Sequence, residues 1–191
     1  MIYTLTLPAE PVDEREIMRY MGCLSDDADA EALIRSCVSE ALPVTVCKVC
    51  YGEFDMTVSD DTVDFGFATV RSCSLSKHLS GCRRAVIFAA TAGIGIDRLI
   101  ARYGAVSPAR ALCMQCFGAE RIESICDAFE EKVTEGRSAR SRFSPGYGDL
   151  SLDFQRQIFC VLDCSKKIGV TLNQSLLMSP TKSVTAIIGI E

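Results

Sequence analysis

The chain has 191 residues, of which 48% are hydrophobic and 24% are charged, and its formal net charge is −5. This length supports one substantial core, and the composition is typical of a soluble globular protein and excludes a disordered chain. The negative charge argues against a nucleic-acid partner, because binding to phosphates needs a basic surface.

The apolar runs and the cysteines predict where the protein works. The longest apolar run, residues 85–96, is interrupted by glycines and is too short to span a bilayer, so no membrane association is expected. The N-terminal sequence lacks the basic start and apolar run of a signal peptide. We therefore expect a cytoplasmic protein whose 11 cysteines are reduced thiols, most of them buried as small hydrophobic residues.

The chain begins with a predicted extended segment and a short helix. Residues 2–7 alternate apolar and hydroxyl side chains, which indicates an edge strand or an extended arm. Asp13 is a predicted helix N-cap, and Glu16 three residues later is its predicted reciprocal partner. Gly22 is expected to end this helix.

A second helix and a group of strands follow. Asp26 or Asp27 is the predicted N-cap of this helix, which carries apolar residues at helical spacing until Pro43. The hydrophobic period then changes to two and predicts an antiparallel meander of three strands, at residues 44–51, 54–58 and 62–70. The predicted turns between the strands are Gly52-Glu53 and Ser59-Asp60-Asp61.

The remaining elements are mostly helices around one buried strand. The predicted elements are a helix at 74–79, a strand at 84–91, helices at 97–103, 107–135 and 153–162, and strands at 175–178 and 183–190. Strands in a block with helices gathered around them favour an α+β fold over a repeating βαβ pattern.

One stretch is unlike the rest of the chain: Arg142-Phe143-Ser144-Pro145-Gly146-Tyr147-Gly148. The proline pushes Ser144 out of the helical region, while Gly146 and Gly148 can take positive φ and leave room for a close-packed ligand. Tyr147 offers a flat face and a hydroxyl, and Arg142 offers a fork of donors for a carboxylate or phosphate. The stretch suits a small ligand with an anionic group at one end and a flat or cationic group at the other. An ordinary tight loop is the alternative.

Acidic residues on the predicted long helix provide a second candidate feature. Glu123 and Asp127 are four residues apart, so their carboxylates face the same way. They form either a solvated helix face or, if this face looks at Tyr147, a site that attracts a cationic ligand. With 1 histidine in the chain, no Ser/His/Asp or Cys/His arrangement is evident.

The paired cysteines allow a zinc or redox interpretation. Cys47 and Cys50 lie too far along the chain from Cys113 and Cys116 for a zinc ribbon. Residues three apart in a strand also point to opposite faces, so the first pair converges poorly. The second pair shares a helix face with apolar neighbours, which favours core packing.

A glycine turn provides another alternative. Gly93 and Gly95 follow a predicted strand and open a helix, as in a phosphate-binding loop, but Arg98 stands where a third glycine is needed. The turn is therefore either a dinucleotide site or methyltransferase loop, or a strand-to-helix turn without a ligand.

Several motifs together resemble a known family. The matching residues are Arg142-Phe-Ser-Pro-Gly-Tyr-Gly-Asp149, Leu172-Asn-Gln-Ser175, Met178-x-Pro180 and Ser183-Val184. They are similar to the R-x-x-x-G-Y motif and the L-x-x-S…M-x-P…S-V tail of the reactivation domain of cobalamin-dependent methionine synthase. The segment Phe88-Ala-Ala-Thr-Ala-Gly93 and the acidic helix around Glu123 resemble the free-standing form of this domain, a separate subunit in some bacteria. The resemblance covers about residues 60–190.

The resemblance implies a fold and a site. The fold would be a single C-shaped α+β domain with a bent, mainly antiparallel sheet and flanking helices. Residues 1–42 would be an N-terminal helical segment that can dock a partner, and residues 43–191 the S-adenosylmethionine-binding activation domain. Arg142 would hold the ligand carboxylate, and the backbone from Ser144 to Gly148, which includes Gly146, would contact adenine and ribose. Tyr147 would lie against the ligand, and Glu123 or Asp127 would balance its positive charges.

The resemblance also implies partners and cofactors. In this family an oxidised cobalamin is reduced by flavodoxin or another reductant and is remethylated from S-adenosylmethionine. Cobalamin would then belong to a methionine synthase subunit on another chain, and no general base or metal site is needed here. No segment of this chain is matched to the family's aspartate in its aromatic-rich segment, and Ile187, Ile188 and Gly189 replace the family's aromatic residues after S-V. The alternatives are a module that binds S-adenosylmethionine or a corrinoid protein without methyl transfer, and a self-sufficient methyltransferase that uses the Gly93/Gly95 turn.

Overall fold

The computed structural model describes residues 1–24 and 27–191. The helical elements are α1 (Glu14–Met21), α2 (Ala28–Ala41), the 3-10 turn η1 (Leu42–Val44), α3 (Cys73–His78), α4 (Ile94–Gly104), α5 (Pro108–Thr134), α6 (Phe154–Leu162) and α7 (Cys164–Ile168). The strands are β1 (Ile2–Thr6), β2 (Lys48–Asp55), β3 (Thr57–Val58), β4 (Thr62–Asp64), β5 (Thr69–Arg71), β6 (Arg84–Thr91), β7 (Thr171–Leu172), β8 (Met178–Ser179) and β9 (Ser183–Ile190).

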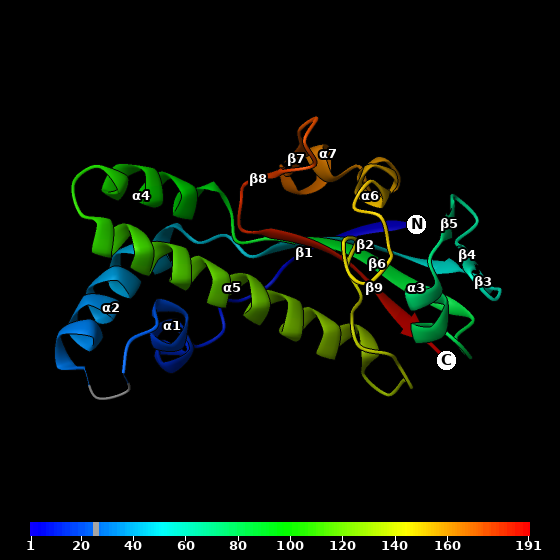
Figure 1. Ribbon diagram of the computed structural model, residues 1–191, viewed down its shortest axis with the longest axis horizontal. Coiled ribbons are helices and arrows are strands. Elements are labelled where there is room, and N and C mark those ends of the chain that lie inside the picture. The colour runs from blue at the N-terminus through cyan, green and yellow to red at the C-terminus, as the bar shows by residue number, and fades with distance from the viewer. Residues whose placement is uncertain (25–26) are drawn as a thin grey trace.

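A four-stranded antiparallel sheet in the order β1-β2-β6-β9 crosses the middle of the molecule (Figure 1). Two smaller antiparallel sheets, β3-β4-β5 and β7-β8, accompany it. This combination of antiparallel sheets and flanking helices confirms the predicted α+β class.

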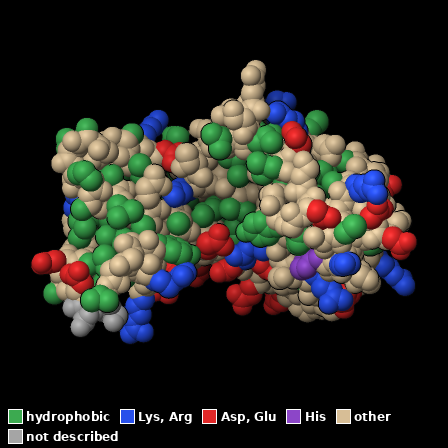
Figure 2. Space-filling model, viewed as in Figure 1, with side chains coloured by type: hydrophobic (Ala, Val, Ile, Leu, Met, Phe, Trp, Pro, Cys, Tyr) green, Lys and Arg blue, Asp and Glu red, His purple; other side chains and the backbone are tan. Residues whose placement is uncertain are grey.

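The central sheet is buried on both faces. Along β6, Val86 and Phe88 belong to a core shared with α1, α2, α4 and α5, whereas Ile87 and Ala89 belong to a second core shared with α3, α6 and α7. Both faces of β6 are covered along the apolar run of residues 85–90, which agrees with the prediction that this is the most buried strand. The face shown in Figure 2 is hollowed between the two halves of the molecule, which gives the predicted C-shaped outline.

The first 42 residues contribute to the same central sheet and to one of its two cores. β1 pairs with β2 at the edge of the central sheet, and Ile17, Ile34 and Cys37 are fully buried in the core that contains Phe117. Among the helices of residues 1–24 and 27–191, none has both the length and the apolar composition needed to cross a membrane.

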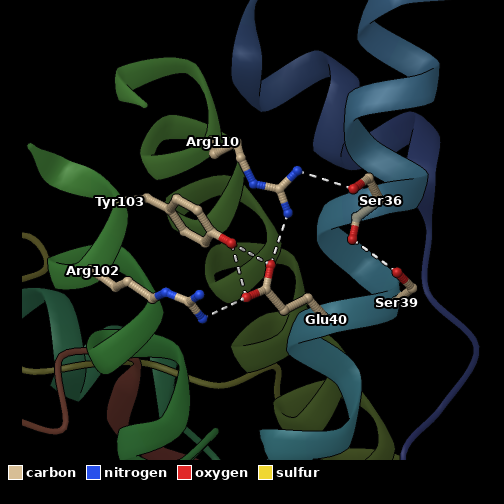
Figure 3. A network of polar contacts seen from close by, with 6 residues as sticks. All are labelled: Ser36, Ser39, Glu40, Arg102, Tyr103 and Arg110. Carbon is tan, nitrogen blue, oxygen red and sulfur yellow. Dashed lines mark hydrogen bonds and ion pairs between the residues drawn. The ribbon is translucent and has the colours of Figure 1, made fainter. Parts of the chain in front are cut away.

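A polar network joins three of these helices. The carboxylate of Glu40 on α2 accepts hydrogen bonds from Tyr103 on α4 at 2.7 Å, from Arg110 on α5 at 2.8 Å and from Arg102 on α4 at 3.2 Å (Figure 3). The hydrogen bond from Tyr103 is the main cause of a lowered pKa for Glu40, followed among the attractive contacts by the one from Arg110. The network therefore holds α2 against the helices beside it.

The helix caps agree in part with the sequence. Asp13 caps α1 by accepting from the N–H groups of Arg15 and Glu16, and Gly22 ends this helix with a φ of 70°. The sequence predicts that Glu16 accepts a hydrogen bond from the backbone N–H of Asp13. This prediction is wrong, because that N–H donates to the side chain of Glu120 on α5 at 3.0 Å. Asp27 caps α2, and Asp26, the other candidate, lies outside the described residues.

The predicted turn at Gly52-Glu53 is also wrong, since both residues lie within β2. The side chains of Ile2 and Phe54 occupy the space where a Cβ of residue 52 would lie, at 2.7 Å and 2.8 Å. Glycine at this position is thus required by packing and does not mark a turn. The predicted strand over residues 62–70 is divided into β4 and β5 by a turn at Gly66, where φ is 78°.

Candidate ligand-binding groove

The segment that carries Arg142 runs along the free edge of the central sheet. After α5 the chain returns beside β9, where Phe143 exchanges two backbone hydrogen bonds with Ile187, at 2.8 Å and 2.9 Å. The N–H of Arg140 donates to Gly189 at 2.9 Å in the same antiparallel direction. These bonds set Arg142 between β9 and α5.

The turn that follows is tied to α3. The N–H of Tyr147 donates to the carbonyl of Ser144 at 3.1 Å, and the N–H of Gly146 donates to that of Leu150 at 2.9 Å. Asp149 accepts from the backbone N–H groups of Cys73 and Ser74, which fastens the turn to the first residues of α3. The turn is therefore held by main-chain and capping bonds at both ends.

Both glycines of the turn take the predicted positive φ, 92° at Gly146 and 55° at Gly148. A Cβ at Gly148 would lie 2.6 Å from the hydroxyl of Ser74, and one at Gly146 would lie 3.4 Å from Leu152. The space that Gly148 leaves is thus occupied by α3. Glycine is needed there both for the conformation and for close packing within the protein.

Arg142 lies in a cluster of carboxylates from α5. Its Nη1 donates to Asp127 at 2.6 Å and to Glu130 at 2.9 Å, and its Nη2 donates to Glu123 at 2.8 Å. The guanidinium side chain is 23% exposed. One turn of helix separates each carboxylate from the next, so all three reach the same cation.

The cluster has more negative than positive charge, since three carboxylates surround one guanidinium. Burial lowers the pKa of Arg142, but the hydrogen bonds to Asp127 and Glu123 outweigh this effect and raise the pKa above its usual value. The arginine therefore stays charged, and the remaining negative charge favours a ligand with a cationic group.

A groove of about 550 Å³ opens beside this cluster. Four of the predicted site residues line it: Glu123, Arg142, Ser144 and Tyr147. Its volume lies within the range of small-molecule sites, about 300–1,000 Å³. The groove thus unites the acidic face of α5 with the stretch that contains Tyr147, as the sequence-based hypothesis of a cationic site requires.

The other predicted residues lie next to the groove. Asp127 contacts Arg142 but does not line the groove. Gly146 and Gly148 do not line the groove either. Tyr147 is 61% exposed, and its ring meets the ring of Phe143 edge-on with centroids 6.0 Å apart. Most of the Tyr147 side chain is therefore accessible.

Two hollows elsewhere are larger. One of about 1080 Å³ lies along α1 and α5 and shares Glu123 and Asp127 with the Arg142 cluster, and one of about 940 Å³ lies beside α1 and α2. Neither is lined by Arg142 or Tyr147. The smaller groove is therefore the site at which the predicted chemistry converges.

The groove also contains residues that the sequence did not single out as ligand contacts. They are Glu130, Ser141, Gln155, Met178, Ser183, Val184 and Thr185. Met178, Ser183 and Val184 belong to the tail motif identified in the sequence, and this motif was a sequence signal that they lie near the ligand. Gln155 carries no such signal, because only the fold brings α6 to this groove.

The glycine turn at Gly93 and Gly95 has a packing explanation. A Cβ at Gly95 would lie 2.3 Å from the carbonyl oxygen of Val44, and one at Gly93 would lie 3.2 Å from Val46. None of the hollows described above is lined by either glycine. Close contact with the segment that leads into β2 accounts for both.

The cysteine pairs are arranged as core residues. Cys47 and Cys50 face opposite cores, as the strand geometry predicts, and Cys113 and Cys116 are buried in the core shared with α5. The hydrogen bond with Cys37, followed by burial, raises the pKa of Cys113. Within residues 1–24 and 27–191, no three His, Cys, Asp or Glu side chains are grouped as metal ligands.

Comparison with known proteins gives a structural match. No family model and no curated protein matches the sequence. A crystal structure of the MetH reactivation domain bound to AdoHcy has the same fold, with a TM-score of 0.72 and 14% sequence identity, over 99% of this chain and 78% of that one. The chain thus has the reactivation-domain fold that the motifs predict.

Proposed function

We propose that this protein binds S-adenosylmethionine in the Arg142 groove and supports the reductive methylation of cobalamin on a methionine synthase subunit. The observation that carries the proposal is the convergence of Arg142, Ser144, Tyr147 and Glu123 in one groove. The fold is that of a domain whose crystal structure contains AdoHcy, the demethylated product of S-adenosylmethionine.

The charges around Arg142 fit the amino-acid half of this ligand. A guanidinium has five N–H donors, and Arg142 makes three side-chain hydrogen bonds to the residues that the structure describes. Donors on Nε and Nη2 then remain for the ligand carboxylate. Glu123, with a side chain that is 49% exposed, can pair with the ligand ammonium. The ligand would extend the alternation of charges that the cluster already contains.

The sulfonium has two features to contact. The excess negative charge of the cluster favours it, and the exposed ring of Tyr147 offers a face rich in electrons. Bound S-adenosylmethionine would supply an electrophilic methyl group to reduced cobalt on the partner, with the electron coming from flavodoxin or another reductant. This chain would orient the ligand and keep its methyl group accessible, tasks that need no general base.

The partners are part of the proposal. We place the cobalamin on another polypeptide in the cytoplasm, and we propose residues 1–42 as a docking surface for it. α1 supports this role, since residues of α1 line both of the larger hollows and are accessible there.

Calorimetric titration with S-adenosylmethionine tests the site. We expect the parent protein to bind and Arg142→Ala to lose detectable binding, because loss of a buried charge-assisted pair costs about 2–5 kcal/mol. Arg142→Lys keeps the charge but not the fork and should bind more weakly than the parent. Arg140→Ala is the matched control, since Arg140 lies on the same segment outside the groove. Equal binding by the parent and Arg142→Ala would place the ligand elsewhere.

A reconstituted assay tests the reaction. Cob(II)alamin-loaded methionine synthase, a reductant and methyl-labelled S-adenosylmethionine are mixed with the protein, and label on cobalamin is measured. Label that depends on this chain supports reactivation. Binding of the ligand without label would instead favour a module that senses S-adenosylmethionine or escorts a corrinoid protein.

A further inference from the structure

Two buried polar groups in the groove have no hydrogen-bond partner in the described part of the chain. Oε1 of Gln155 and Oγ1 of Thr185 both lack one among the residues that the structure describes. Gln155 is 6% exposed and Thr185 is 2% exposed, and both line the Arg142 groove. Ser183 lines the same groove, but its hydroxyl has two partners: it donates to the carbonyl of Pro180 at 2.8 Å and lies at hydrogen-bond distance, 2.9 Å, from the hydroxyl of Thr91.

These two groups are unfavourable for the protein alone. A buried donor or acceptor that loses water without gaining a partner destabilises the folded state, and native proteins contain few such groups. Valine has nearly the shape of threonine, and methionine has nearly the length of glutamine, so apolar side chains would fill both positions. Polar side chains that face a groove are therefore suited to a ligand that completes their hydrogen bonds.

The two groups lie on the side of the groove away from the carboxylates. Thr185 is paired with Ala89 on β6, whose side chain belongs to the core shared with α6, and Gln155 lies on α6 itself. The antiparallel direction brings Pro145 towards Thr185, because each lies two residues from the bridge that joins Phe143 and Ile187. The groove thus has a charged side at α5 and an uncharged polar side at α6 and β9.

We propose that Gln155 and Thr185 form a subsite for the nucleoside half of the ligand. This inference rests on the proposed function for the identity of that ligand. With the amino-acid half at the charged side, the adenosine half extends towards α6 and β9. The amide of Gln155 offers a donor and an acceptor to the edge of adenine, and the hydroxyl of Thr185 can donate and accept.

The test compares Gln155→Met and Thr185→Val with the control Gln157→Met. Gln157 lies on the same helix two residues later and is exposed. Each protein is titrated with adenosine, observed by ligand NMR, and with S-adenosylmethionine, observed by calorimetry. Adenosine has no amino-acid half, so its binding reports on the subsite independently of Arg142.

We expect each groove variant to weaken binding of both ligands by about tenfold, the equivalent of about 1.4 kcal/mol, while the control binds as the parent does. Thermal unfolding without ligand should give the groove variants a midpoint equal to or above that of the parent, which a merely structural role would not produce. A lower midpoint in both variants would overturn the proposal.

Failure of the subsite can be told apart from failure of the proposed function. If S-adenosylmethionine binds all four proteins equally but fails to bind Arg142→Ala, the function stands and the subsite is wrong. If adenosine binds the parent and control but binds the groove variants about tenfold more weakly, the subsite stands even without binding of S-adenosylmethionine. Absence of adenosine binding to the parent would overturn the subsite.

Discussion

Arg142 and Glu130 form the most buried contact of the acidic cluster. Nη1 of Arg142 lies 2.9 Å from Oε2 of Glu130, and both side chains are 23% exposed. The contact links the edge segment beside β9 to α5. It also holds the negative charge of Glu130 at the groove wall, where a cationic ligand would meet it.

Removing this charge should change ligand preference. S-adenosylmethionine carries a sulfonium that S-adenosylhomocysteine lacks, so we expect Glu130→Gln to reduce the preference for the former by about two- to fivefold. Titration of the parent and the variant with both ligands at low and high salt measures this preference. The difference between the two proteins should be smaller at high salt. Glu131→Gln is the control, because this exposed neighbour does not line the groove. An unchanged preference in Glu130→Gln at low salt would contradict an electrostatic role.

Asp149 should stabilise the turn in a pH-dependent way. Hydrogen bonds from Ser72 and from the N–H of Ser74 lower the pKa of Asp149 below its ordinary value. A lowered pKa means that the folded state favours the ionised form, so this stabilisation is complete above the ordinary carboxyl pKa of about 4 and is lost as pH falls towards the lowered value.

Asp149→Asn should therefore lower the unfolding midpoint by a few degrees at pH 7. The difference from the parent should shrink between about pH 5 and pH 2. Thermal melts of both proteins across this range are the measurement. Asp153→Asn is the control, since the side chain of Asp153 bonds no N–H at a helix start. A difference that stays constant with pH would argue against the capping role.

Glu40 should matter for stability and not for ligand binding. Glu40→Gln removes the charge that Arg102 and Arg110 share, and we expect urea unfolding to show a loss of about 1–2 kcal/mol. Glu31→Gln, on the same helix, breaks only an exposed pair with Arg35 and should cost about 0.3–0.5 kcal/mol. Affinity for S-adenosylmethionine should be unchanged, because Glu40 does not line the groove. An equal loss in both variants would show that the network stabilises the protein no more than a single exposed ion pair does.

Two glycines of α4 should respond in opposite ways to alanine. Gly95→Ala brings a Cβ within 2.3 Å of the carbonyl oxygen of Val44, so we expect a loss of about 1–3 kcal/mol in urea unfolding. Gly104→Ala meets no atom within 4 Å and should stabilise the helix by about 0.5–1 kcal/mol. The folded fraction of both variants should keep S-adenosylmethionine binding. Selective loss of binding in a folded Gly95→Ala would support the alternative site at this turn.

Local chemistry allowed much of the secondary structure to be predicted. The helix ends at Asp13, Gly22 and Pro108 depend on side chains and φ values within a few residues, so they can be read from the sequence. The strand over Arg84–Thr91 is a long apolar run with few alternatives. The charged part of the site could be predicted for a similar reason, because helical periodicity alone puts Glu123 and Asp127 on one face.

The tertiary structure decided the features that depend on distant segments. Ile2 and Phe54 pack into the space beside Gly52 and make it part of a strand, and Glu120 replaces Glu16 as the partner of the Asp13 N–H. The polar side of the groove also depends on distant segments, because folding brings Gln155 on α6 beside β9. Caps, periodicity and turn residues act within a few positions and can be predicted from the sequence alone. Whether a buried polar atom finds a partner depends on segments that only folding brings together, so that was decided by the tertiary structure.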